Sequence, residues 1–112
     1  MSKKRDDKLY VDDILDSINA IQKYIYEIDY NDFVENRMIY SATIRELEII
    51  GEATGKISQT IKDKYPNIDY RTIKDFRNVL AHEYFGVDME IVYSIVKHKL
   101  PSLKEQILQI DI

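Results

Sequence analysis

Apolar residues recur at spacings of three and four along most of this chain, and this pattern constrains the fold more than any other feature. Within residues 9–28 it places one apolar stripe along a helix, with acidic residues between its members. The stripe consists of Ile14, Leu15, Ile18, Ile21, Ile25 and Ile28. The 112 residues include only 3 Gly and 2 Pro, so the residues that short strands and tight hairpins need are scarce. The sequence therefore predicts an all-α protein.

The same spacing predicts further helices at 33–56, 58–64 and 70–86, and a last helix after Asp88. The expected N-caps are Asn31 or Asp32, Ser58, Asp69 and Asp88. Gly86 is expected to end its helix, and Pro101 predicts a kink or a one-turn break near Lys99. A chain of this length can bury one core but not two. We expect residues 1–112 to form a single antiparallel bundle of four to five helices.

Composition excludes several classes of function. The chain has no Cys, which rules out disulfides, thiolate zinc sites and cysteine nucleophiles. Its 20 acidic and 16 basic residues give a net charge of −4, so any contact with RNA must be local rather than the work of a broad basic field. Neither a signal segment nor a membrane-spanning stretch is evident. We expect a cytoplasmic protein without a membrane partner.

The segment FRNVLAHEYFG, residues 76–86, carries more polar chemistry than a core helix needs. Its notable side chains are Arg77, Asn78, His82 and Tyr84. On a straight helix Asn78 and His82 share one face, whereas Arg77 and His82 lie about 140° apart around the axis. A long arginine side chain, a distorted last turn or a second copy of the helix across a two-fold axis could bring Arg77 and His82 into one cleft. The last alternative makes a homodimer part of the site.

Arginine and histidine together suit phosphodiester transfer without a metal. An imidazole can take the proton from a ribose 2′-hydroxyl, and a guanidinium can neutralise the charge that develops on the phosphate, which leaves a cyclic phosphate product. His82 and His98 show no metal-ligand spacing, so we expect neither a metal nor a cofactor. His98 is expected to be a solvated residue near a helix end.

Plainer interpretations of the same residues remain open. His82 could be a surface histidine bonded to a neighbour, and Arg77 could pair with Asp75 or Glu83. Gly51, inside a predicted helix, indicates either close packing of two helices or room for a partner.

RNVLAHEY, residues 77–84, matches the R-x4-H-x-Y motif of the HepT-like toxins of the HEPN superfamily. RELEIIGEATGKIS at 45–58 and GVDMEIVYSIVKHKLPSLKEQI at 86–107 also resemble helices of that family, so that the likeness covers nearly the whole chain. The chain departs from many relatives in having Tyr70 and Tyr93 where they place tryptophans, which keeps the aromatic volume and adds a hydroxyl.

This resemblance implies an all-α homodimer in which Arg77 and His82 of both copies line an interface cleft and act as a metal-independent ribonuclease. It also implies a minimal nucleotidyltransferase antitoxin as partner, which in part of the family transfers AMP to the motif tyrosine, here Tyr84. Asn78 joins the site only through the face that it shares with His82. The alternative is a non-catalytic helical dimer that serves as adaptor or substrate of the nucleotidyltransferase, and a plain scaffold dimer is a third possibility.

Overall fold

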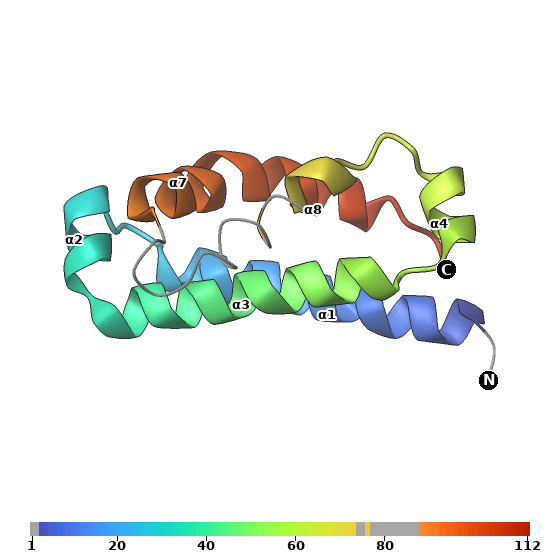
Figure 1. Cartoon of the computed structure of the whole chain (residues 1–112), viewed down its shortest axis with the longest axis horizontal. Coiled ribbons are helices and arrows are strands. Elements are labelled where there is room, and N and C mark those ends of the chain that lie inside the picture. Colours follow the sequence, from blue (N-terminus) through green and yellow to red (C-terminus); the bar gives the residue numbers. More distant parts are fainter. Residues whose placement is uncertain (1–2, 74–75, 77–87) are drawn as a thin grey trace.

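The chain forms an elongated bundle in which the long helices run side by side (Figure 1). The computed structural model describes residues 3–73, 76 and 88–112. Its α-helices are α1 (Lys3–Tyr24), α2 (Tyr30–Glu35), α3 (Arg37–Lys56), α4 (Gln59–Lys64), α7 (Met89–Ser94) and α8 (Leu100–Leu108), and a π-helical turn, η1 (Ile95–Lys99), joins the last two. These residues include no β strand, which confirms the predicted all-α class.

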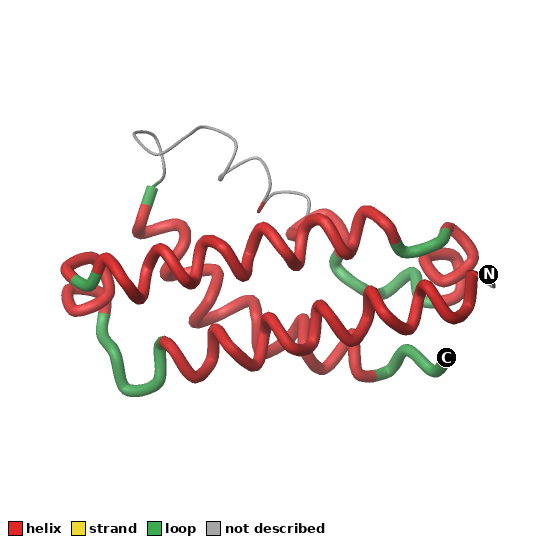
Figure 2. Tube along the Cα trace, turned by 90° about the horizontal axis from the view of Figure 1, so that it is seen from below, coloured by secondary structure: helices red, strands yellow, loops and turns green. Residues whose placement is uncertain are grey.

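Helices α1 and α3 form the most extensive packing pair and run in opposite directions (Figures 1 and 2). The continuous stretch α7–η1–α8 lies against α1 through α8 and against α2 through α7. The short helices α2 and α4 lie at opposite ends of the bundle, and the chain ends beside α4 (Figure 1). Within these described residues, no helix is long and apolar enough to cross a membrane.

The core is built from the predicted apolar stripes. Of the six stripe residues predicted at 9–28, Ile14, Ile18, Ile21 and Ile25 are buried, while Leu15 and Ile28 are only partly covered. Helix α1 ends at Tyr24, so Ile25 and Ile28 lie beyond it. The buried stripe residues meet residues of the other helices that are also almost fully buried: Phe33, Leu47, Ile50, Val92, Val96, Leu100 and Ile107. Gly51 is buried within α3, which favours the packing interpretation over an open contact with a ligand.

The prediction of one helix over 33–56 is wrong, because the chain breaks between α2 and α3 at Asn36. Asn36 adopts an extended conformation and its side-chain oxygen accepts a hydrogen bond from the Ile39 N–H, so that it caps α3. The cap of α2 is Asp29, which bonds the Asp32 N–H, rather than Asn31 or Asp32. Because α2 is a separate helix, the expected count of four to five helices is not confirmed.

Three other predicted caps are confirmed. The Ser58 hydroxyl accepts from the Ile61 N–H at the start of α4, and Asp88 accepts from two N–H groups at the start of α7. Asp69 accepts from the Thr72 N–H, and residues 70–73 and 76 are helical. The remainder of the predicted helix 70–86, including the expected stop at Gly86, lies outside the described residues.

The disturbance expected near Lys99 takes the form of the π turn. Pro101 has no N–H, and in a regular helix its ring would collide with the carbonyl of Lys97. The Leu100 N–H instead bonds the carbonyl oxygen of Ile95, five residues back, which is the π pattern. The helix therefore continues past the proline by inserting one wide turn.

Candidate functional site

The residues that the sequence singles out as a site, Arg77, Asn78, His82 and Tyr84, lie outside the described residues. The structure describes the chain on both sides of this segment, up to Phe76 and again from Asp88. We call these two flanks the motif frame. The contacts of the motif frame show how the chain is held on either side of the motif.

The N-terminal flank begins with a strong cap. The Asp69 carboxylate accepts from both the backbone N–H and the hydroxyl of Thr72, and these bonds hold its pKa below the usual range. The positive charges of Lys99 and Arg71 lower this pKa further, against an opposing effect of burial. The Asp69 N–H donates a 2.8 Å hydrogen bond to the Gln106 side-chain oxygen, which ties this flank to α8.

Side chains that follow the cap hold the same flank in the core. Ile73 and Phe76 are each 1% exposed. Phe76 directly precedes Arg77 in the chain, so the last described position before the motif is a fixed core position. Tyr70 donates its hydroxyl to the Tyr65 carbonyl oxygen at 3.0 Å, and burial raises its pKa.

The C-terminal flank is held by Asp88 and Tyr93. After the Asp88 cap, Tyr93 packs its ring edge-on to Tyr30 and at a tilt against Phe33. The Tyr93 hydroxyl donates a 2.6 Å hydrogen bond to the carbonyl oxygen of Ile28. In Tyr93, as in Tyr70, the side-chain hydroxyl has a backbone acceptor.

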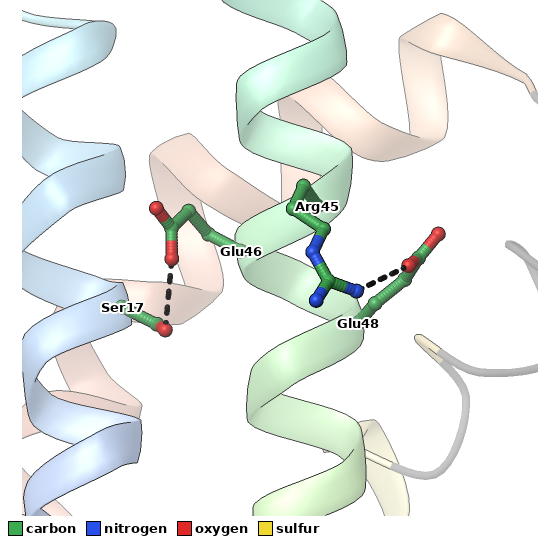
Figure 3. A network of polar contacts seen from close by, with 4 residues as sticks. All are labelled: Ser17, Arg45, Glu46 and Glu48. Atoms are coloured by element: carbon green, nitrogen blue, oxygen red, sulfur yellow. Dashed lines mark hydrogen bonds and ion pairs between the residues drawn. The ribbon is translucent and has the colours of Figure 1, made fainter.

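Sequence reasoning missed a polar link between the two longest helices. Glu46 of α3 accepts hydrogen bonds of 3.0 Å from Ser17 and from Tyr24, both of α1. Figure 3 shows Glu46 pointing toward Ser17, whereas Arg45 and Glu48 form their exposed ion pair away from α1. The bond to Glu46, followed by burial and the negative charge of Glu46, raises the pKa of Tyr24. Nothing in the sequence distinguishes Glu46 from its solvated neighbours.

A second feature that the sequence did not indicate is a groove of about 220 Å³ between residues 69–72 and the start of α8. Its lining residues are Asp69, Thr72, His98, Lys99, Ser102, Leu103 and Gln106. His98 is exposed, as expected, but it borders this groove rather than open solvent alone. Among the described residues, no group of three or more His, Cys, Asp or Glu could hold a metal ion.

Comparison with known families identifies the chain. Its residues 14–110 match the family described as Ribonuclease HepT-like. This chain belongs to the HepT-like ribonuclease family of the HEPN superfamily. The match covers the motif at 77–84 and both flanks of the frame, and it confirms the resemblance derived from the sequence.

Two relatives show how far the similarity extends. The chain is 42% identical over 104 residues to "Putative RNase MJ1380" of Methanocaldococcus jannaschii, which covers 93% of this chain and 95% of the relative. It is 41% identical over 101 residues to "Probable ribonuclease HepT" of Thermococcus cleftensis, which covers 90% of this chain and 92% of the relative. No solved structure matches.

Proposed function

We propose that this protein is a metal-independent endoribonuclease and the toxin of a type VII-like toxin–antitoxin pair. One observation carries the proposal: the HepT-like match spans residues 14–110 and includes Arg77 and His82 at the family's motif spacing. Two relatives that align over nine-tenths of the chain bear ribonuclease names. Buried side chains and hydrogen bonds hold the motif frame on either side of the motif. This supports the proposal, because catalytic groups must be held within narrow geometric limits.

The chemistry follows from the two motif side chains. His82 takes the proton from a ribose 2′-hydroxyl, and the resulting oxygen attacks the adjacent phosphorus. The bond from phosphorus to the 5′-oxygen breaks, and that oxygen takes up a proton. Arg77 neutralises the charge that builds on the phosphate oxygens. The products are a 2′,3′-cyclic phosphate and a 5′-hydroxyl, without a metal or a cofactor.

The proposal includes a homodimer in which Arg77 and His82 of both copies face one interface cleft. Arg77 and His82 lie five positions apart in sequence, and this spacing on a straight helix points the two side chains in different directions. A second copy related by a two-fold axis would supply the missing partner. Asn78 and Tyr84 would contact or support the RNA in the same cleft.

The proposed regulator is a minimal nucleotidyltransferase antitoxin that transfers AMP from ATP to the Tyr84 hydroxyl and releases pyrophosphate. The added phosphate would bring negative charge and bulk next to His82. RNA, itself a polyanion, would then be excluded by repulsion and by lack of space.

The deciding experiment is RNA cleavage by the purified protein and by His82→Ala, in the presence of EDTA. We expect the parent to cut RNA and leave cyclic phosphate ends, and His82→Ala to lose about 10²- to 10⁴-fold in rate. Tyr26→Ala is the control, because it also removes one ring but lies at a 73% exposed position outside the motif. Circular dichroism and light scattering check that fold and assembly are kept. Equal rates for the parent and His82→Ala would instead favour the non-catalytic adaptor of a nucleotidyltransferase.

A further inference from the structure

The groove beside residues 69–72 combines positive charge with hydrogen-bond donors that have no acceptor among the described residues. Lys99 and His98 come from the end of η1, and Ser102 and Gln106 follow on α8. Leu103, which is 3% exposed, is the most deeply buried residue of its lining. A single water needs a cavity volume of roughly 10–15 Å³. The groove has a volume of about 220 Å³, so it leaves room for a much larger polar group.

The π turn sets which residues meet in the groove. It ends at Lys99, and the helix then presents Ser102 and Gln106 one and two turns further along. Turns of this kind are frequent at functional sites in proteins. Here the wide turn lets the helix pass Pro101 while His98 and Lys99, both exposed, border the same space.

The hydrogen bonds already present decide what the groove can still bind. Both oxygens of the Asp69 carboxylate are engaged by Thr72, and the Gln106 oxygen accepts from the Asp69 N–H. The Gln106 amide therefore presents its NH₂ group as the remaining side-chain function. Within the described residues, the ammonium of Lys99 has no carboxylate within 4 Å. Lysine, histidine, serine and amide donors together suit a phosphate oxygen.

The charge balance agrees with an anionic ligand. Asp69 contributes one negative charge, but Lys99 and Arg71 both lie close enough to stabilise it. Among the described residues, the positive charges of Lys99, which lines the groove, and of Arg71, which does not, thus act on one carboxylate whose oxygens are already bonded. This local excess stands out in a protein whose net charge is −4 and which offers RNA no broad basic field.

We infer that this groove is a backbone subsite for the RNA substrate, in which Lys99, His98 and Ser102 contact a phosphodiester group. The inference rests on the proposed ribonuclease function. One wall of the groove, at residues 69–72, belongs to the flank that precedes the motif in the sequence, and buried Phe76 holds this flank in the core. Such contacts position a nucleic acid without reading its sequence.

The test is a binding measurement that needs no cleavage. A fluorescent RNA oligonucleotide with 2′-O-methyl groups cannot react, because its 2′-oxygens carry no proton to remove. Its fluorescence anisotropy is followed with the wild type, with Lys99→Gln and with the double variant Lys99→Gln/His98→Gln, between about 50 and 200 mM salt. We expect affinity to fall about two- to fivefold for each substituted side chain, and the slope of log Kd against log salt to fall by about 0.7 for each phosphate that is no longer neutralised.

Lys97→Gln is the matched control. It removes the same charge from the same π turn, but Lys97 lies over the Tyr93 ring at 5.7 Å and does not line the groove. Lys97→Gln is expected to bind like the wild type, and thermal melting checks that all variants are folded. Equal weakening by Lys97→Gln and Lys99→Gln would mean a general charge effect and would overturn the inference.

The remaining outcomes separate this inference from the proposed function. If the wild type cuts natural RNA and the groove variants bind the oligonucleotide unchanged, the function stands and the subsite inference is wrong. If groove variants weaken binding but the wild type cuts no RNA, the subsite stands and the ribonuclease activity does not. If the wild type neither binds the oligonucleotide nor cuts RNA, both the subsite inference and the proposed ribonuclease function are wrong.

Discussion

The Tyr93 hydroxyl bonds the carbonyl oxygen of Ile28 at 2.6 Å, across 65 positions of the chain. This bond joins α7 to the connection between α1 and α2, and it fixes the flank at which the described chain resumes after residue 87. One end of the motif frame is thus tied by a polar contact to a segment that lies far from it in the sequence.

Tyr93→Phe should lower the free energy of unfolding by about 0.5–1.5 kcal/mol, because the ring contacts remain and the Ile28 carbonyl is left without its partner. Urea denaturation measures the change as a lower midpoint at an unchanged slope. Tyr26→Phe is the control, since Tyr26 is 73% exposed and should change the midpoint little. Equal midpoints for Tyr93→Phe and the wild type would show that this hydrogen bond contributes nothing to stability.

Glu46→Ala should destabilise the protein by about 1–3 kcal/mol, because it removes two hydrogen bonds between α1 and α3 and leaves buried Ser17 with an unpaired hydroxyl. Glu48→Ala makes the same chemical change two residues away, where the ion pair with Arg45 is exposed, and should cost less than about 0.5 kcal/mol. Chemical denaturation of both variants gives the comparison. A Glu48 variant as unstable as the Glu46 variant would rule out the interhelix link as the cause.

Asp69→Ala should cost about 0.5–2 kcal/mol at neutral pH through removal of the cap. The folded-state pKa of Asp69 lies below its ordinary value of 3.8, so its stabilisation is present above that value and is lost as the pH falls through the folded pKa. The difference in melting temperature between wild type and variant should therefore be constant from about pH 5 to 8 and narrow below about pH 4. Asp13→Ala, at an exposed position of α1, controls for removal of a negative charge. A difference that stays constant into strong acid would contradict a role for the ionised carboxylate.

Co-expression with the proposed nucleotidyltransferase antitoxin should add one or more AMP groups to Tyr84 and abolish RNA cleavage, because phosphate charge would then fill the cleft. Intact-mass measurement and peptide mapping detect the adduct, which Tyr84→Phe should lack. Tyr26→Phe, which keeps Tyr84, should be modified like the parent. An adduct at another residue, or a modified protein that cuts RNA at the parental rate, would contradict the proposal that AMP transfer to Tyr84 inactivates the protein.

Local patterns predicted much of this fold because they depend on bonds within one turn of helix. The stripe of α1 follows from isoleucines three and four residues apart, and Ser58, Asp69 and Asp88 cap N–H groups two or three residues ahead. The same spacing did not predict the helix break at Asn36, because the apolar pattern continues through this residue. In the structure Asn36 caps α3, and Phe33 of the separate helix α2 is buried in the core.

The sequence by itself determined the helical class, the three helix starts at Ser58, Asp69 and Asp88, and the family, since RNVLAHEY and its neighbouring segments can be matched directly as residue patterns. Tertiary structure alone decided that Glu46 would link α1 to α3 and that His98 and Lys99 would share a groove with Asp69. Contacts of this kind join residues far apart in the chain, and they arise from the packing of whole helices. No local spacing encodes which polar side chain will face another helix, because that depends on how each helix is rotated when its apolar stripe is buried.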